Sequence, residues 1–243
     1  MKKNLIIDIG NTACKAAYSV GKEIEPIFTK DGLNPLLYLQ EVTTDEVFDT
    51  IVLSSVQERD SQLILWLKEK AGKLIVVDGD TPTVLRIDYQ TPDRLGADRL
   101  AAGVGAVTQY PGKDLLVIDF GTAITYDFIS KERQFMGGNI SLGLQMRCKA
   151  LHQFTYALPL ILPSKDEEVP EYGIDTRGNI VAGVIWGIVH ELEGYIAKNQ
   201  DKTIIFTGGD ALFFAQMLKT PIFVDCNLVF IGLAQIAQSY AEK

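Results

Sequence analysis

Short apolar runs of strand length dominate the first half of the chain. Runs of four to eight apolar or β-branched residues bounded by polar residues are typical of buried strands in α/β proteins. The segments expected to form these strands are Leu5–Ile9, Ala16–Val20, Ile24–Phe28, Asp49–Val56 and Leu74–Val77. Pro26 would confine the third of them to a sheet edge, because proline cannot donate to a strand ladder.

The segment between the last two of these runs has apolar residues at a different spacing. Within Ser61–Ala71 the apolar residues recur at helical spacing, at Leu63, Ile64, Trp66 and Leu67. This spacing predicts a helix with one buried face. The first half therefore reads as a strand hairpin followed by alternating helix and strand, which indicates an α/β fold.

The second half repeats this opening and then becomes helical. Expected strands are Leu115–Ile118, Thr125–Ile129, Gln134–Ile140 and Thr203–Phe206, and expected helices are Leu142–Tyr156, Thr176–Lys198 and Val229–Ala241. A helix over Gly96–Gln109 and the Pro111-Gly112 turn are expected to link the halves. Leu158–Lys165 contains two prolines and is expected to be a surface crossing or a lid. The predicted domains are residues 1–112 and 113–243.

Composition narrows the classes of function. The 243 residues include 23 basic and 31 acidic ones, for a net charge of −8. This balance disfavours a nucleic-acid or anionic-membrane surface, which would need clustered Lys and Arg. The three cysteines are far apart and read as reduced thiols of a cytoplasmic protein. No stretch reaches the roughly 20 consecutive apolar residues of a membrane span.

Two turns of the same type open the two halves. Asp8 and Asp119 each end an apolar strand and are followed two residues later by Gly10 and Gly121, with a hydroxyl residue close behind. Backbone N–H groups at such turns can hold phosphate oxygens, and a carboxylate can hold Mg²⁺ directly or through water. A hairpin turn without a ligand is the alternative. Two such turns in one chain favour a duplicated domain that closes over a nucleotide.

Further motifs refine this picture. Asp98 is expected in the first turn of a helix, where the helix dipole favours a carboxylate, and beside Arg99 it could serve phosphoryl transfer to an alcohol. A surface carboxylate is the alternative. Thr207–Asp210 is a further glycine turn that could lie against a nucleotide, and Gly137-Gly138 permits either close approach of a ligand or a tight strand-to-helix turn. His152 is expected on a helix face with a polar partner.

At these motifs the chain resembles the type III pantothenate kinases of the actin-like ATPase superfamily. The order and spacing of the matching blocks extend over nearly the whole chain. The blocks are Asp8–Thr12, Leu95–Arg99, Asp119–Ala123, Gly137–Ile140, Leu151–Pro159, Thr176 and Thr207–Asp210. The resemblance implies two duplicated ribonuclease-H-like domains with a nucleotide cleft between them. It also implies ATP-dependent phosphorylation of pantothenate to 4′-phosphopantothenate, the first step of coenzyme A biosynthesis.

The resemblance also assigns roles to residues. Asp98 corresponds to the general base that accepts the proton of the pantothenate hydroxyl. The ATP-binding residues are expected to be Asp8, Ile9, Gly10, Asn11, Thr12, Ala13, Cys14, Lys15 and Thr122. The pantothenate-binding residues are expected to be Tyr89, Gly96, Ala97, Asp98, Arg99 and Thr176. Asp119 corresponds to the ligand of a monovalent cation, K⁺ or NH₄⁺, required besides Mg²⁺, and the family implies a homodimer.

One position departs from the family pattern, and two other functions remain open. Leu142 stands where the family usually carries proline, which would fit the first turn of the following helix. Its replacement is expected to change local rigidity more than chemistry. The alternatives are a kinase for another small alcohol on the same fold, and a nucleotide-binding accessory regulator of transcription. The acidic net charge argues against direct DNA contact by such a regulator.

Overall fold

The chain folds into two compact units and contains two six-stranded sheets. The computed structural model describes residues 3–21, 23–25, 28–32, 34–44, 46–57 and 60–241. The first unit comprises Met1–Lys113, Ile129–Gly137 and Asn227–Lys243, and the second comprises Asp114–Phe128 and Gly138–Cys226. The expected boundary at 112/113 lies one residue from the first change of unit, but the C-terminal segment groups with the first unit.

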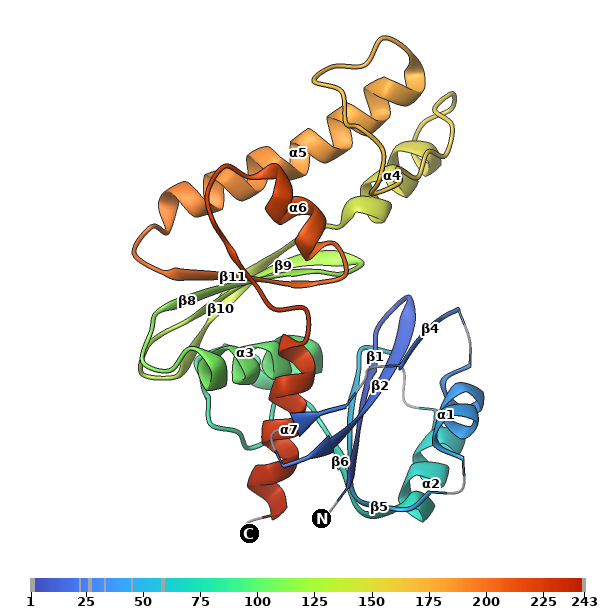
Figure 1. Ribbon diagram of the computed structural model, residues 1–243, viewed down its shortest axis with the longest axis vertical. Helices are drawn as coiled ribbons and strands as arrows, with labels where there is room; N and C mark the ends of the chain where they lie inside the picture. The colour runs from blue at the N-terminus through green and yellow to red at the C-terminus, as the bar shows by residue number, and fades with distance from the viewer. Residues whose placement is uncertain are drawn as a thin grey trace. The chain divides into compact units, whose positions relative to one another are not determined.

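The sheet of the first unit has the strand order β3-β2-β1-β5-β6, with β4 also paired to β2 (Figure 1). Its strands are β1 (Asn4–Ile9), β2 (Ala13–Val20), β3 (Glu23–Ile24), β4 (Phe28–Asp31), β5 (Phe48–Ser55) and β6 (Ala71–Val76). β1 pairs antiparallel with β2 and parallel with β5. The hairpin and the parallel strands expected from the sequence are therefore present.

Helices cover both faces of this sheet. They are α1 (Pro35–Thr43), α2 (Ser61–Lys70), α3 (Ala97–Gln109) and α7 (Leu228–Ala241). Leu5, Ile7 and Ile9 of β1 form one buried cluster with residues of α1 and α2. Because side chains alternate across a strand, Ile6 and Asp8 lie on the opposite face. In Figure 1, α1 and α2 lie on one side of the sheet and α7 on the other.

Helix α3 belongs to the core of the first unit, so the expectation that it forms part of a linker is wrong. Its residues from Leu100 to Val107 are all buried. It packs against α7 through two glycines: a Cβ on Gly105 would lie 2.1 Å from the carbonyl oxygen of Leu228, and one on Gly232 would lie 1.8 Å from that of Ala101. The apolar face of α3 is thus closed by the last helix of the chain. The Pro111-Gly112 turn, with Gly112 at φ +71°, precedes the change of unit.

The second sheet has the order β12-β11-β8-β9-β10-β7. Its strands are β7 (Arg86–Ile87), β8 (Leu115–Phe120), β9 (Ala123–Ile129), β10 (Gln134–Leu142), β11 (Thr203–Gly208) and β12 (Phe223–Val224). The helices of the second unit are α4 (Leu144–Gln153), α5 (Thr176–Lys198) and α6 (Ala211–Met217). Leu116, Ile118 and Phe120 of β8 share one buried cluster with Ile185 of α5 and Phe214 of α6.

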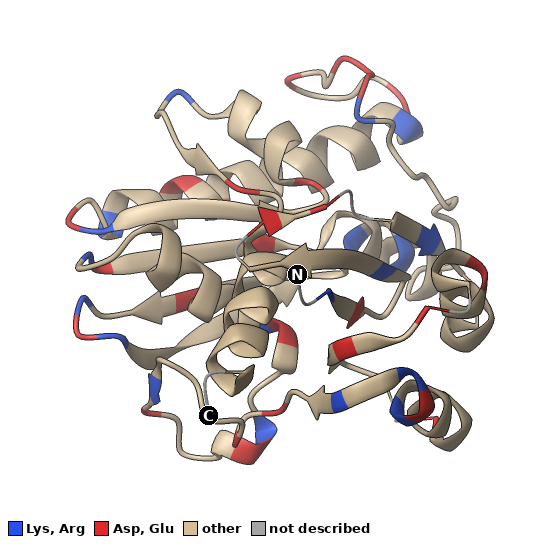
Figure 2. Cartoon of the chain, turned by 60° about the horizontal axis from the view of Figure 1, so that its bottom comes forward, with Lys and Arg blue, Asp and Glu red and all other residues tan. Residues whose placement is uncertain are grey.

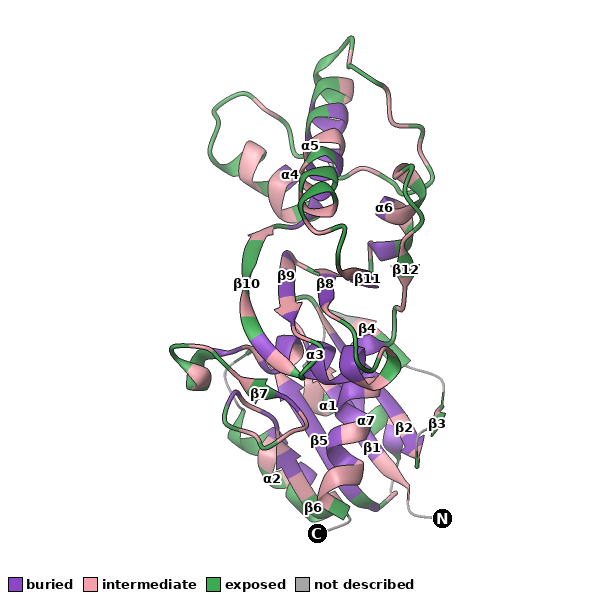
Figure 3. Cartoon of the chain, turned by 90° about the vertical axis from the view of Figure 1, so that its left-hand side faces the viewer, coloured by how far each residue is buried: buried purple, intermediate pink, exposed green. Residues whose placement is uncertain are grey.

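Helix α5 is long and apolar enough to cross a membrane by length and composition, and 44% of its most apolar window is buried inside the protein. Among the described residues it is the one helix of that kind. Burial colouring shows the pattern of a core helix, with a buried side and an exposed side (Figure 3). Its apolar surface on the buried side is therefore accounted for by packing on the second sheet.

Several expected elements differ in detail. The single strand expected over Ile24–Phe28 is instead two short strands, β3 and β4, both paired to β2; Pro26 lies outside the described residues. β6 begins at Ala71, because α2 ends at Lys70. Helix α4 ends at Gln153, and the segment from Leu158 to Ser164 is irregular as expected. The apolar pattern does not predict α1, α6, β7, β12 or the short 3₁₀ helix η1 (Pro92–Arg94).

The paired glycines and Leu142 are also placed differently from expectation. Gly137 and Gly138 lie inside β10 rather than at a strand-to-helix turn, and Gly137 has a φ of +117° that an L side chain rarely adopts. Leu142 ends β10, and α4 begins two residues later after the N-cap Gly143. Position 142 therefore lies outside the first turn of α4. A proline at this position would not occupy the first helical turn, where it was expected to affect local rigidity.

Candidate functional site

The turn between β1 and β2 presents backbone groups rather than a continuous side-chain surface. Gly10 N–H donates to the carbonyl oxygen of Ala13 at 2.9 Å and closes the turn, and Asn11 and Thr12 are exposed on it. Ile9 and Cys14 flank the turn with side chains buried in the core. Burial, with a smaller effect of the Asp8 charge, raises the pKa of the Cys14 thiol to about 12. These two residues can reach a ligand only through their backbone.

Asp8 lies between two polar side chains at the end of β1. In the sheet register it is opposite Lys15 of β2 and opposite Ser54 of β5. The Ser54 hydroxyl donates to Asp8 Oδ1 at 2.9 Å. A carboxylate, an ammonium and a hydroxyl thus lie side by side at the edge where the parallel strands β1 and β5 end.

Burial is the main cause of an unusual pKa at Asp8. It raises the pKa of this carboxyl from 3.8 to about 6; the Ser54 hydrogen bond opposes the rise, the charge of Asp98 adds to it, and Lys15 lowers it. The influence of Asp98 means that the two carboxylates lie close enough to interact electrostatically. Perturbed carboxyl groups of this kind occur preferentially at functional sites.

Asp98 lies in the first turn of α3, as expected. Its Oδ1 accepts a hydrogen bond from the backbone N–H of Arg99 at 2.8 Å. A Cβ on the N-cap residue Gly96 would lie only 2.5 Å from that same oxygen. Glycine at position 96 therefore leaves the space that the Asp98 carboxylate occupies, and the second carboxylate oxygen is left for another partner.

Tyr89 and Arg99 are brought together by a ring that the sequence did not single out. The Phe135 ring, fully buried on β10, contacts Tyr89 edge-on with centroids 6.4 Å apart. On the same ring, the guanidinium carbon of Arg99 lies 5.7 Å from the centroid, within cation–π range. Arg99 is itself buried. Two of the expected pantothenate-binding residues are therefore anchored on one aromatic side chain.

The second unit contains the matching turn. Gly121 N–H donates to the carbonyl oxygen of Ala123 at 3.1 Å, and the carbonyl oxygen of Thr122 accepts from Gly143 N–H at 3.1 Å. Asp119 is opposite the buried Thr207 in the parallel register of β8 and β11. Asp119 and Thr122 are thus both at the carboxyl end of β8.

The glycine turn after β11 is fixed on both sides. Gly208 has a φ of +90°, and a Cβ there would lie 2.3 Å from Asp119 Oδ1 and 2.6 Å from the carbonyl oxygen of Phe120. From the irregular segment after α4, Lys165 forms an ion pair with Asp210 at 2.6 Å and donates to the carbonyl oxygen of Gly209 at 2.7 Å. The turn expected to lie near a nucleotide is therefore held against Asp119.

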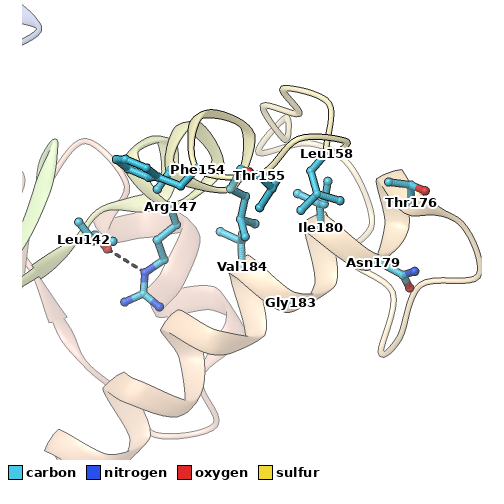
Figure 4. Close-up of a pocket in the computed structure, with 12 residues that line it drawn as sticks. Leu142, Arg147, Phe154, Thr155, Leu158, Thr176, Asn179, Ile180, Gly183 and Val184 are labelled. Carbon is cyan, nitrogen blue, oxygen red and sulfur yellow. Dashed lines mark hydrogen bonds between the residues drawn. The ribbon is translucent and has the colours of Figure 1, made fainter.

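Thr176 lies elsewhere in the second unit, in a groove between α4 and α5. This cavity has a volume of about 770 Å³ (Figure 4). Its lining is mainly apolar and includes Leu142, Phe154, Leu158, Ile180 and Val184, with polar groups from Arg147, Thr155, Thr176 and Asn179. Asp119 and Thr122 are not among the lining residues.

A polar network lies beside this groove. Arg147 forms an ion pair with Glu191, and its Nε donates to the carbonyl oxygen of Leu142 at 2.9 Å. Glu191 also accepts from the Tyr126 hydroxyl at 2.9 Å. His152, in the last turn of α4, has Nδ1 2.8 Å from the carbonyl oxygen of Leu158. The expectation of a helix-face histidine with a polar partner is confirmed.

The first unit thus brings together Asp8, Lys15, Asp98 and the Asp8–Lys15 turn, and beside them the Tyr89–Phe135–Arg99 cluster. Sequence reasoning missed two residues of this arrangement, Ser54 and Phe135. Ser54 had a usable signal, because hydroxyl residues at the carboxyl end of a buried parallel strand lie where α/β folds bind ligands. Phe135 had none, since an isolated aromatic in a strand is ordinary core.

Metal-binding groups are sparse in the part of the chain that the structure describes. No cluster of three or more His, Cys, Asp or Glu residues is found there. A divalent ion would therefore need most of its ligands from water or from a substrate, which is the usual mode of Mg²⁺ in phosphoryl transfer.

Comparisons with known proteins agree on one family. The family model described as type III pantothenate kinase matches residues 4–198. A type III pantothenate kinase from Porphyromonas gingivalis strain W83 is 42% identical over 243 aligned residues, covering 98% of this chain and 99% of that protein. Another, from Bacteroides fragilis strain ATCC 25285, is 41% identical and covers 96% of each chain.

Solved structures share the fold at lower identity. A Campylobacter jejuni protein described as a Baf family transcriptional activator has a TM-score of 0.65 at 24% identity, covering 98% of this chain and all of that one. An activator of 2-hydroxyisocaproyl-CoA dehydratase from Clostridium difficile, with bound ADPNP, has a TM-score of 0.58 at 14% identity, covering 99% and 98%. At these identities the likeness concerns the fold alone, which is the expected actin-like ATPase fold.

Proposed function

Because the chain belongs to the type III pantothenate kinases, we propose that it phosphorylates pantothenate with Asp98 as the general base. The family reaction transfers the γ-phosphoryl group of ATP to the pantothenate hydroxyl and begins coenzyme A biosynthesis. The observation that supports this assignment is the electrostatic influence of Asp98 on Asp8 within one unit. It brings a candidate base close to a candidate phosphate-binding turn.

The proposed roles follow from the geometry of each residue. The carboxylate oxygen of Asp98 that Arg99 N–H does not use accepts the hydroxyl proton. The turn from Asp8 to Lys15 binds ATP through its backbone N–H groups, with Lys15 offsetting phosphate charge. Thr122 supplies a second contact to ATP. Tyr89, Gly96, Ala97, Arg99 and Thr176 bind pantothenate.

Two cations complete the proposal. The residues present fit Mg²⁺ at Asp8, because a partly buried carboxylate near a second carboxylate gains from a divalent cation that neutralises the local charge. When bound with ATP, Mg²⁺ would offset charge on the phosphates. Asp119, held beside Gly208 at the end of β8, would hold K⁺ or NH₄⁺ through a carboxylate oxygen.

We also propose a homodimer that covers the groove between α4 and α5. Large apolar side chains are exposed around it: Phe154 is 81% exposed, and Tyr156, Tyr172 and Ile174 are also exposed. Exposed apolar patches of this kind mark interaction sites. Figure 3 shows the loops after α4 largely exposed. Equilibrium sedimentation should show a dimer, and Phe154→Ser with Ile174→Ser should shift it towards monomer; a wild-type monomer would contradict the proposal.

The proposed enzyme is cytoplasmic and binds neither nucleic acid nor membrane. Figure 2 shows Lys and Arg interspersed with Asp and Glu along the described chain. With a net charge of −8, such a surface offers little attraction to anionic polymers or lipids. The matching turns of Asp8 and Asp119 support a duplication with the domains 1–112 and 113–243.

The first test is ADP release by the purified protein with ATP, Mg²⁺ and pantothenate, in K⁺ buffer and in Na⁺ buffer. We expect turnover that requires pantothenate and is faster in K⁺. Absence of pantothenate-dependent turnover from folded protein would contradict the proposed reaction. A panel of other small alcohols would then identify a different acceptor.

The base is tested by Asp98→Asn, with Asp93→Asn as its matched control. Asp93 is an exposed carboxylate on the neighbouring 3₁₀ helix. We expect Asp98→Asn to lower kcat by about 10²–10⁴-fold while MgATP binding, measured by calorimetry, persists. Near-normal turnover by this variant would overturn the assignment of the base.

A further inference from the structure

The end of β5 lies directly beside the Asp8 turn and contacts three consecutive residues of it. The Ser54 hydroxyl donates to Asp8 Oδ1 at 2.9 Å. Val56 N–H donates to the carbonyl oxygen of Ile9 at 3.1 Å, and the Gln57 side-chain amide donates to that of Gly10 at 2.8 Å. These contacts fix the start of the turn from one side.

Ser54 differs from the other contacts in burial and in target. Its side chain is completely buried, whereas Gln57 is exposed. It is the direct register partner of Asp8 across the parallel pair β1–β5, so its position is set by the backbone ladder that joins these two strands. A hydroxyl held in this way fixes the orientation of one carboxylate oxygen of Asp8.

Fixing one oxygen determines where the other points. A carboxylate on a rotatable Cα–Cβ bond otherwise samples several rotamers. A binding site loses affinity when such a group must become ordered as the ligand binds. With Oδ1 committed to Ser54, Oδ2 of Asp8 remains available to a cation or to ordered water. Second partners of this type commonly set the orientation of metal-associated carboxylates.

We propose that Ser54 is a positioning residue for the phosphoryl donor, which orients the Asp8 carboxylate for MgATP through its hydrogen bond to Oδ1. This inference rests on the proposed assignment of Asp8 to the ATP site. Ser54 itself touches neither nucleotide nor acceptor. Its removal should therefore affect the donor side of the reaction and leave the acceptor side unchanged.

The chain provides a matched control for its removal. Ser19 of β2 is a second fully buried serine in the same sheet, and its hydroxyl has no hydrogen-bond partner among the described residues. Ser19→Ala deletes the same atom from the same core without contact to Asp8. Any general effect of losing a buried hydroxyl in this sheet appears in both variants.

The experiment compares the steady-state kinetics of Ser54→Ala, Ser54→Thr and Ser19→Ala. We expect Ser54→Ala to raise the KM for MgATP and the Mg²⁺ concentration needed for half-maximal rate by about 10–150-fold, a range set by the loss of a hydrogen bond to a charged group. The KM for pantothenate should change by less than about twofold, because Ser54 acts through Asp8. Ser54→Thr, which keeps the hydroxyl, should recover most of the loss, and Ser19→Ala should match wild type.

A double-mutant cycle shows whether Ser54 acts through Asp8. In an Asp8→Ala background, Ser54→Ala should add no further increase in the KM for MgATP. A full additional increase there, an unchanged KM in the single variant, or an equal change in Ser19→Ala would overturn the inference. If Asp8→Ala itself leaves the KM unchanged, the assignment of Asp8 is wrong and the inference falls with it. Should Ser54→Ala not fold, Ser54→Cys keeps the side-chain shape with a weak donor and is held to the same outcomes.

Discussion

The turns at Asp8 and Asp119 are built alike but are supported differently. In both, the glycine two residues after the aspartate donates to the carbonyl oxygen of an alanine, at 2.9 Å for Gly10 and 3.1 Å for Gly121. In both, the parallel neighbouring strand places a hydroxyl residue opposite the aspartate, Ser54 in one case and Thr207 in the other. The repeat therefore extends beyond the two sequence motifs to the strands beside them.

The surroundings of the two carboxylates account for the difference between the turns. Asp8 is influenced by two ionisable side chains, Lys15 and Asp98, which act on its charge. Asp119 is instead packed against backbone, at a glycine that leaves no space for a Cβ. One repeat has an adjustable charged setting, whereas the other has a rigid one. This division suits a donor site that must bind and release a highly charged nucleotide and a second site that holds a small ion.

The largest effect should come from removing each charge in turn. Asp8→Asn should lower kcat/KM for MgATP by about 100-fold or more, which is about 2.7 kcal/mol. Asp119→Asn should instead reduce the stimulation by K⁺ over Na⁺ and affect MgATP less. Initial rates in both buffers, at saturating pantothenate, distinguish the two. Equal responses of the two variants would show that the repeats have not diverged in this way.

Rigidity of the second turn is tested at Gly208. Gly208→Ala should destabilise the protein by about 2–4 kcal/mol, because an L residue is strained at φ +90° and the new methyl group meets the Asp119 carboxylate and Phe120 backbone. Gly209→Ala is the control, since a Cβ there meets nothing within 4 Å. Urea unfolding measures both. Similar midpoints for the two variants would contradict the rigid setting of Asp119.

Charge sensitivity of the first turn predicts a pH-dependent stability. The pKa of Asp8 is about 6 in the folded chain and 3.8 in the reference state, so the folded state holds the proton more tightly. The contribution of protonated Asp8 to the free energy of unfolding is therefore fully present below about pH 4 and is lost as the pH rises through about 6. Relative to Asp8→Asn, the wild type should lose about 1–2 kcal/mol between pH 4.5 and 7.5 in ATP-free buffer. A constant difference in unfolding free energy across that range would refute this.

The smallest expected effect concerns the acceptor side, where the Tyr89–Phe135–Arg99 cluster lies in the first unit. Phe135→Leu removes the ring that supports Tyr89 and Arg99. It should raise the KM for pantothenate by about 3–10-fold, corresponding to about 1 kcal/mol, with little change in the KM for MgATP. Phe128→Leu, on a strand of the second unit, serves as the control. An equal rise in both Michaelis constants would indicate general loosening instead.

Much of the fold follows from periodicity, and the exceptions have physical causes. Helix α5 was predicted with its observed bounds, because its apolar spacing is long and Asp175 caps it by accepting from Gly178 N–H. Helix α3 was predicted in place but with the wrong role, since the Pro111-Gly112 turn after it suggested a linker, whereas its small residues pack closely against α7. The two turns were predicted from Asp and Gly spacing. Ser54 beside Asp8, and Phe135 beside Tyr89 and Arg99, were not predicted, because tertiary pairing brings them there.

The packing of α7 on α3 has a consequence for the order in which the chain is made. Gly232 and Gly105 allow the two helices to approach each other closely. During translation, the N-terminal sheet and α3 leave the ribosome more than a hundred residues before α7 does. The first unit therefore cannot complete its core until α7 has been made, and a chain stopped before Leu228 would leave the buried face of α3 uncovered.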